Sequence, residues 1–172
     1  MSRRHRIVMP YVFSSLPSFV RADVDVLGER HDVEVVPSGS WREMLEAARV
    51  AWSATVLLCW FGSVRYLPAV LVARLRGVPV VVIAGGYDVA REPEIGYGNM
   101  VGGARKWFGR LLFRLATHVV PYSQAGAKEA RAHALVPASR MRVIPLGFET
   151  SGGADVPIEE KEPFILSVGL MN

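Results

Sequence analysis

The sequence predicts an α/β fold with a doubly wound parallel sheet of about six strands and helices on both faces. Short apolar segments alternate with amphipathic segments along the 172 residues. The clearest apolar segment, 78–84, is apolar at every position and rich in β-branched residues, which is typical of a strand buried on both faces. Gly85 and Gly86 follow it directly. Because ligands of open α/β sheets bind beyond the carboxyl ends of the strands, this point is a candidate site.

The expected elements follow one another in a regular order. Strands are predicted at residues 6–10, 32–36, 55–61, 78–84, 118–122 and 141–144. Helices are predicted between them at residues 18–29, 40–51, 66–76, 104–117 and 123–134. Three of these helices have a serine that can cap their first free N–H groups, namely Ser18, Ser40 and Ser123. Glu43 follows Ser40 at the spacing of a capping box. This succession predicts a Rossmann-like sheet.

The third strand decides between two possible strand orders. Residues 55–61 are apolar almost throughout, which places this strand in the interior of the sheet and not at its rim. The order 2-1-3-4-5 keeps the third strand inside, whereas the order 3-2-1-4-5-6 puts it at the edge. We therefore expect the first of these orders.

Composition narrows the class of protein. Hydrophobic residues make up 51% of the chain and charged residues 21%, as in a globular domain. The net charge of +4 permits an anionic partner without requiring one. A single cysteine, Cys59, argues against a disulfide framework and fits a reducing compartment. The basic start followed by apolar residues is similar to a signal peptide, but Pro10 and Pro17 interrupt it, so a first strand and a cytoplasmic location are expected.

The segment between residues 88 and 103 has no hydrophobic period and several glycines. A loop of this length between packed elements is usually functional, although a tolerated insertion is the alternative. Gly98 and Gly103 have the spacing of a phosphate-binding loop, but Ala104 stands where that motif needs its lysine. The loop after the first strand, 11–17, also lacks the glycines of a dinucleotide site.

The helix predicted at 104–117 combines basic and aromatic residues. Lys106, Arg110 and Arg114 fall on one stripe, and Trp107 begins a neighbouring apolar stripe. This pattern suits a peripheral contact with an anionic membrane surface. It equally suits a core helix whose outer face is basic. The sequence leaves both interpretations open.

The end of the chain changes in character. Residues 151–163 are polar, with glycines, prolines and a charged cluster, and are interpreted as an interdomain linker after a first domain at 1–150. Residues 164–172 begin with an apolar segment that has no helix after it. We interpret them as the first strand of a second domain, the rest of which is missing here.

Four stretches resemble the first half of glycosyltransferase family 4, whose members have the GT-B fold. They are Gly77 to Val89 around the fourth strand, His118 to Ala125, Arg140 to Glu149 with its R-V-I-P-L-G core, and Phe164 to Gly169. The resemblance covers about residues 54–172 well and the rest by pattern only. Its specificity comes from the order and spacing of the four pieces together.

The resemblance implies an enzyme that transfers a sugar from a nucleotide-sugar to a saccharide or lipid-linked acceptor with retention, as in the synthesis of cell-envelope polysaccharides. In that family the first domain holds mainly the acceptor and the second holds most of the donor. No metal and no cofactor beyond the nucleotide-sugar co-substrate are implied, nor is a nucleic-acid partner. Gly169 corresponds to a glycine near the donor phosphates, although Leu170 replaces the usual arginine. The fragment alone is expected to be inactive, because the cleft needs both domains.

The same resemblance suggests candidate site residues. The family often has a histidine in its H-G-x-D segment, and Gly85 stands at that position here. Asp88 is the candidate catalytic residue, because a carboxylate at a strand end can accept a hydrogen bond from a sugar hydroxyl. Capping of N–H groups in the turn is the alternative role of Asp88. The candidate substrate-binding residues are Ser14, Ser15, Gly85, Gly86, Tyr87, Tyr97 and Ser123.

Two other classes of function are compatible with an α/β domain. A stand-alone α/β module could bind a small anionic ligand or a protein without catalysis, but the linker and the last apolar segment argue against a self-contained end. A different α/β enzyme, such as a nucleotide-sugar epimerase or a hydrolase, lacks support, because neither a dinucleotide fingerprint nor a G-x-S-x-G elbow is present.

Overall fold

The computed structural model describes residues 4–147, and the structural statements below concern this part of the chain. The predicted linker at 151–163, the predicted strand at 164–172 and Gly169 lie outside the described residues. The strands are β1 (Arg6–Tyr11), β2 (Asp32–Pro37), β3 (Val56–Trp60), β4 (Val80–Ala84) and β5 (His118–Pro121). The helices are α1 (Ser18–Gly28), α2 (Trp41–Ala51), α3 (Leu67–Leu75), α4 (Gly103–Leu115) and α5 (Gln124–Ala132). Short 3-10 turns are η1 (Val64–Tyr66), η2 (Pro93–Ile95) and η3 (Ala138–Arg140).

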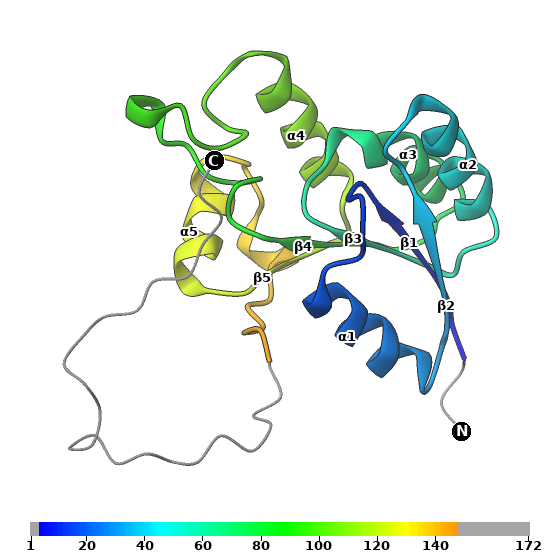
Figure 1. Cartoon of the computed structure of the whole chain (residues 1–172). Coiled ribbons are helices and arrows are strands. Elements are labelled where there is room, and N and C mark those ends of the chain that lie inside the picture. Colours follow the sequence, from blue (N-terminus) through cyan, green and yellow to red (C-terminus); the bar gives the residue numbers. More distant parts are fainter. Residues whose placement is uncertain (1–3, 148–172) are drawn as a thin grey trace, which may run out of the picture.

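The five strands form one parallel sheet in the order β2-β1-β3-β4-β5, which confirms the predicted order (Figure 1). The central strand β3 pairs with β1 through Val56 opposite Ile7, and with β4 through Leu57 opposite Val80. Because β3 lies between two strands and two layers of helices, its inner residues are shielded from water. Cys59 is fully buried there, and burial raises the pKa of its thiol above the usual range, so it is a packing residue.

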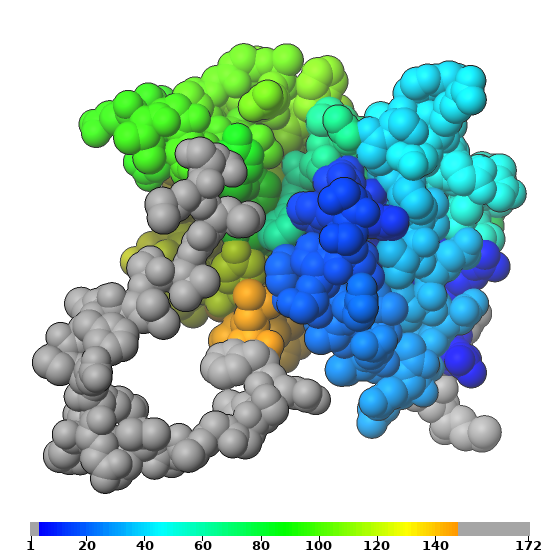
Figure 2. Space-filling model, in the orientation of Figure 1, coloured from blue at the N-terminus to red at the C-terminus, as the bar shows by residue number. Residues whose placement is uncertain are grey.

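Helices cover both faces of the sheet. Helix α1 packs on one face, where Val20 joins Ile7 and Met9 in a small apolar cluster. Helices α2, α3 and α4 cover the other face, where Val70 and Leu112 belong to the larger core cluster. Figure 1 shows the two layers on either side of the sheet. Figure 2 shows one face of the molecule. Residues 88–103 and α4 occupy one side of this face, and β1 with α1 occupies the other side.

The predicted sixth strand at 141–144 is not formed as a strand. Only Met141 makes a β-bridge, with Val119, and the backbone N–H groups of Arg142 and Ile144 donate to carbonyls of β5 at 3.1 and 3.0 Å. Arg142 and Ile144 are exposed, so the segment follows the sheet edge without being buried by a further layer. Pro145 then offers no N–H group to continue the ladder.

Two of the three predicted serine caps are confirmed. Ser40 and Glu43 form a capping box, with Ser40 N donating to Glu43 Oε2 at 2.7 Å. Ser123 Oγ accepts from Gly126 N at 3.0 Å at the start of α5. The prediction for Ser18 was wrong, because Pro17 is the N-cap residue and its carbonyl accepts the first helical bond from Arg21 N. Ser18 is therefore already the first residue of the helix.

Candidate functional site

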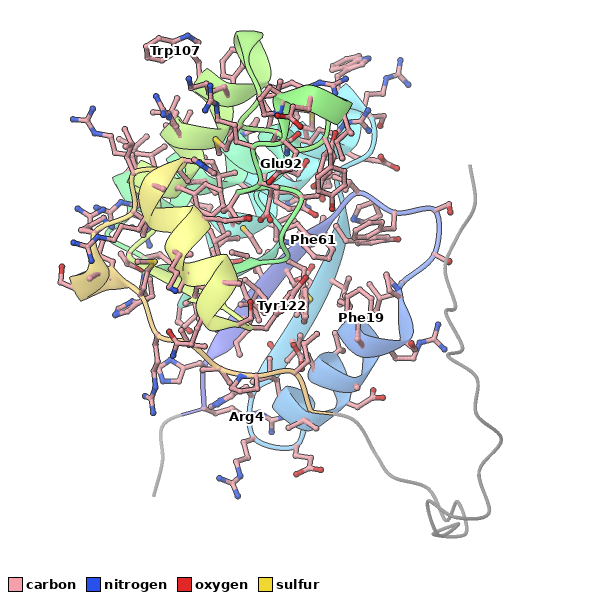
Figure 3. All side chains as sticks on the ribbon, turned by 90° about the vertical axis from the view of Figure 1, so that its left-hand side faces the viewer. Arg4, Phe19, Phe61, Glu92, Trp107 and Tyr122 are labelled. Atoms are coloured by element: carbon pink, nitrogen blue, oxygen red, sulfur yellow. The ribbon has the colours of Figure 1, made fainter. Side chains whose placement is uncertain are left out.

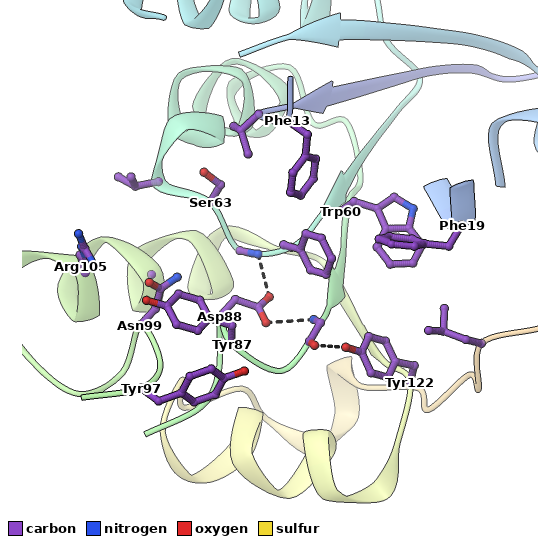
Figure 4. Close-up of a pocket in the computed structure, with 17 residues that line it drawn as sticks. Phe13, Phe19, Trp60, Ser63, Tyr87, Asp88, Tyr97, Asn99, Arg105 and Tyr122 are labelled. Atoms are coloured by element: carbon purple, nitrogen blue, oxygen red, sulfur yellow. Dashed lines mark hydrogen bonds between the residues drawn. The ribbon is translucent and has the colours of Figure 1, made fainter. Parts of the chain in front are cut away.

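A pocket of about 590 Å³ lies at the carboxyl edge of the sheet (Figure 4). It opens between the loops that follow β1, β3 and β4 and the first turns of α4. This is the edge at which the sequence placed the candidate site. Its lining residues are Val12, Phe13, Phe19, Trp60, Phe61, Gly62, Ser63, Val64, Gly85, Tyr87, Asp88, Tyr97, Asn99, Arg105, Gly109, Tyr122 and Leu146.

The Asp88 carboxylate accepts hydrogen bonds from the backbone at the ends of two neighbouring strands, at the base of this pocket. Its Oδ2 accepts from Gly62 N at 2.8 Å, just after β3. Its Oδ1 accepts from Gly85 N and Gly86 N, each at 3.0 Å, just after β4. Asp88 is only 3% exposed although it lines the pocket. The capping role considered for Asp88 is therefore present in the structure, and any chemical role must be carried by the same carboxylate.

Burial controls the protonation of this group. Removal from water raises the pKa of Asp88 from 3.8 to about 6, although the hydrogen bonds from the backbone N–H groups act in the opposite direction. A carboxyl group with a pKa near neutrality can exchange a proton at physiological pH. Such a group in a cleft is a typical feature of a functional site, although structural networks also produce it.

The absence of a side chain at Gly85 has a steric cause. A Cβ atom placed there would lie 1.9 Å from Cε1 of Phe61. Phe61 has a φ of +70°, a left-handed conformation that is rare for a large residue. Its N–H group still donates to Ile83 O at 2.9 Å, so the ring is turned over the end of β4 while the backbone remains attached to the sheet. The ring of Phe61 thus fills the space into which a side chain at position 85 would point.

Four aromatic rings surround the inner end of the pocket, and we call them the aromatic cluster: Phe13, Phe19, Trp60 and Phe61. Ring centroids are 5.5 Å apart for Trp60 and Phe61, and 5.7 Å for Phe13 and Phe61. Phe19 lies 5.0 Å from Trp60 and 6.2 Å from Phe61. Trp60 Nε1 donates to Asp23 Oδ2 at 3.1 Å, which fixes the indole ring. No sequence motif predicts this cluster, since its members lie after β1, in α1 and at the end of β3.

The segment after Asp88 is an ordered part of the pocket wall. Glu92 and Tyr97 exchange backbone hydrogen bonds at 2.9 and 3.0 Å, and Asn99 N donates to Tyr87 O at 2.9 Å. The rings of Tyr87 and Tyr97 meet edge to face with centroids 5.1 Å apart. Both predicted tyrosines line the pocket and remain about half exposed. The long loop thus brings two candidate residues together.

Several polar groups in the pocket were also missed. Asn99 and Arg105 line the end opposite Phe19 and Trp60, and Ser63 lines the wall beside Phe13 (Figure 4). Tyr122 donates its hydroxyl hydrogen to Gly85 O. Burial raises the pKa of Tyr122, which keeps it in its neutral, donating form. These residues come from separate loops and from α4, so no local sequence motif links them.

Other predicted residues lie outside the pocket. Ser14 and Ser15 are exposed and do not line it. Gly86 is next to the pocket and has a φ of +108°, which requires glycine in the turn. The hydroxyl of Ser123 is engaged as the cap of α5. Within residues 4–147, no group of three His, Cys, Asp or Glu side chains could hold a metal ion.

Only part of the predicted basic stripe of α4 can contact a membrane surface, because one of its cations has a partner inside the domain. Arg110 is half-buried and its Nε donates to His133 O at 2.8 Å, so this guanidinium holds α4 against the end of α5. Trp107 is 72% exposed, and Figure 3 shows it at the outer end of the molecule, away from Phe61 and Tyr122. No helix in the described part of the chain is long and apolar enough to cross a membrane.

Comparison with known proteins identifies the family. The family model described as "glycosyl transferase 4-like domain" matches residues 10–147, which is most of the chain. The chain belongs to this family. The pocket, Asp88 and the aromatic cluster all lie within the matched region.

A solved structure supports the same fold class. The chain is similar to "UDP-GlcNAc 2-epimerase from Neisseria meningitidis bound to UDP-GlcNAc", with a TM-score of 0.51 and 14% identity. The match covers 80% of this chain and 45% of the epimerase, so the chain spans less than half of that protein. At this identity the similarity concerns the fold only. No curated protein sequence matches the chain significantly.

We predict that the Asp88 carboxyl group makes this glycosyltransferase-like domain less stable as the pH rises, which is the reverse of the usual effect of an aspartate. The folded pKa, about 6, exceeds the usual value of 3.8, so the folded state holds the proton more tightly than the unfolded state. The stabilisation from this proton is complete below about pH 4 and is lost as the pH rises through 6. Relative to Asp88→Asn, the free energy of unfolding should fall by about 2 kcal/mol between pH 4 and pH 7. Urea unfolding across this range measures it; a constant difference between the two proteins contradicts it.

We also predict that Gly85→Ala destabilises the domain through Phe61. The added methyl group overlaps a ring that three other rings hold in place, so the free energy of unfolding should fall by about 1–3 kcal/mol. Phe61→Gly removes the ring and suits the positive φ. The double variant should therefore lose far less than the sum of the single changes, as a double-mutant cycle would measure. Additive effects would show that the two positions do not compete for space.

Proposed function

We propose that this chain is the acceptor-binding half of a retaining glycosyltransferase, which transfers a sugar from a nucleotide-sugar to a saccharide or lipid-linked acceptor. Membership of the glycosyl transferase 4-like domain family supports the reaction class. The observation that carries the assignment to an acceptor site is the 590 Å³ pocket, which lies at the carboxyl edge of the sheet and combines rings with a few polar groups. Retention and the kind of acceptor are part of the proposal.

In the proposed reaction, an acceptor hydroxyl oxygen forms a bond to the anomeric carbon of the donor sugar, while the bond from that carbon to the nucleotide phosphate oxygen breaks. The acceptor hydroxyl proton passes to the leaving phosphate. Asp88 accepts a hydrogen bond from the hydroxyl and orients it. Among residues 4–147, its Oδ2 accepts from Gly62 N alone and can accept a second hydrogen bond from the pocket side. Tyr87 and Tyr97 contact the acceptor sugar ring. No cofactor beyond the nucleotide-sugar takes part.

In this proposal most of the donor site is supplied by a second domain. The epimerase with the same fold class is more than twice as long as the matched part of this chain, which supports a two-domain protein. The 172 residues alone should then show little transfer, since catalysis depends on both reactants being held in place.

The decisive test is to sequence the gene beyond codon 172 and assay the extended protein. We expect a further α/β domain with two glutamates eight positions apart. The extended protein should transfer labelled sugar from a nucleotide-sugar to acceptors in a membrane or saccharide fraction, and Asp88→Asn should lower kcat at least tenfold. A stop codon directly after residue 172, with no transfer by the chain, would contradict the proposal.

A stand-alone binding module is the second candidate. One observation favours it: side chains between Val12 and Leu146 of this chain together line a pocket of about 590 Å³. A ligand would then bind tightly to the chain alone, without any turnover. Equilibrium titration and the transfer assay together distinguish the two functions.

We further propose that α4 rests on an anionic membrane surface and that the enzyme works at the cytoplasmic membrane. The outer face of α4 exposes Trp107, Phe108 and Leu111, and Ile95 of η2 is 77% exposed. Lys106 and Arg114 supply positive charge beside these residues. Aromatic and apolar side chains next to cations are the composition of an interfacial helix.

The membrane proposal predicts that Trp107→Ala weakens vesicle binding. The substitution removes a side chain that the membrane would bury, which costs at least about 1.4 kcal/mol of apolar burial. The affinity for phosphatidylglycerol vesicles should therefore fall about tenfold. Trp52→Ala is the matched control, because Trp52 is 58% exposed and lies at the end of α2, outside the pocket. Vesicle co-sedimentation measures both. Equal losses in the two variants, or equal binding to phosphatidylcholine, would contradict an oriented contact through α4.

A further inference from the structure

The pocket has two chemically different ends. Figure 4 shows Phe19 and Trp60 on one side of the pocket, and Arg105 with Asn99 on the opposite side, beyond Tyr87. An apolar end and a cationic end in one cavity favour a ligand with the same division. An uncharged sugar can stack its apolar face on an aromatic ring, but it offers no anionic group to the cationic end.

The aromatic end is built around Phe61. Its ring contacts Phe13, Phe19 and Trp60, and its positive φ places the backbone in a strained conformation. Gly85 leaves the space that this ring occupies. Phe61 is about half-buried and still lines the pocket. An aromatic ring that a strained backbone and packed neighbours hold against a cavity is suited to contact a ligand.

The cationic end depends on Arg105. Two ion pairs are present among residues 4–147, Arg6 with Glu34 and Arg49 with Glu46, and neither involves Arg105. Arg105 and Gly109 both line the pocket from α4, one turn apart. The amide group of Asn99 adds donors on the same side of the pocket. A guanidinium without a carboxylate partner, next to neutral donors, is suited to a phosphate oxygen.

We propose that the pocket binds an acceptor in which an apolar group is joined to a phosphate, with the apolar group on the aromatic cluster and the phosphate at Arg105. This inference rests on the proposed function, since it names the class of acceptor for the same site. Phe61 is then the residue that selects for the apolar group. Either a prenyl chain or an aryl ring can supply that group, because both can cover the face of Phe61.

The test is equilibrium binding to the 172-residue chain, which does not depend on transfer. The probes are geranyl phosphate, 2-naphthyl phosphate, inorganic phosphate and geraniol, each below its aggregation concentration. We expect at least one ester to bind tenfold or more tightly than both inorganic phosphate and geraniol. Isothermal titration calorimetry measures the affinities. A preference for one ester assigns the apolar group to a prenyl chain or to a ring.

Variants locate the two parts of the ligand. Arg105→Gln should weaken ester binding about tenfold and leave geraniol unchanged. Phe61→Gly should weaken the esters and geraniol by a similar factor and leave inorganic phosphate unchanged. Phe13→Ala provides a second test of the aromatic end if Phe61→Gly does not fold. The matched controls are Arg74→Gln and Trp52→Ala, because both residues are exposed and lie outside the pocket.

The outcomes separate this inference from the proposed function. Esters that bind no better than inorganic phosphate, or that bind equally well to the Arg105 and aromatic variants, overturn the inference. Ester binding by the chain, with no transfer by the extended protein, upholds the inference and rejects the transferase. Transfer to an uncharged saccharide without ester binding upholds the transferase and rejects the inference.

Discussion

The hydrogen bonds from three backbone N–H groups to Asp88 hold the functional edge of the sheet in place. They join Gly62, after β3, to Gly85 and Gly86, after β4, through one buried carboxylate. At this point the strands end and their regular ladder of hydrogen bonds stops, so the N–H groups need another acceptor. Asp88 satisfies them and so fixes the two loops that carry Phe61 and Tyr87. The shape of the pocket therefore depends on a side chain that is itself almost inaccessible.

Phe61 and Gly85 form one structural unit, although they follow different strands, β3 and β4. The family pattern often has a histidine at position 85, and the ring of Phe61 occupies the space that its side chain would need. In terms of that resemblance, the phenyl ring of Phe61 stands at the end of β4 where the family pattern has an imidazole. This exchange removes a group that could donate hydrogen bonds and adds a surface that favours apolar atoms. It changes the chemistry of the pocket floor without changing the fold around it.

Local patterns predicted the fold well and the site only in part. Continuous apolar character at 55–61 was enough to place β3 inside the sheet, and the Ser40–Glu43 spacing predicted the capping box. The segment at 141–144 has a strand-like composition, but an exposed sheet edge gives it no layer to bury its side chains. The aromatic cluster combines residues from after β1, from α1 and from β3. Such a convergence depends on tertiary structure, and no spacing in the sequence reveals it.

Helix α4 links the two surfaces that the proposals concern. Arg105 lines the pocket, whereas Trp107, two residues later, is largely exposed. Two residues correspond to a rotation of about 200° around a helix axis, so these side chains leave opposite faces of α4. Arg110, bonded to His133 O, anchors the same helix to the domain. If the outer face of α4 rests on a membrane, the cationic end of the pocket lies one helix diameter away, about 10 Å. An acceptor that joins an apolar group to a phosphate could then reach the pocket from the membrane surface.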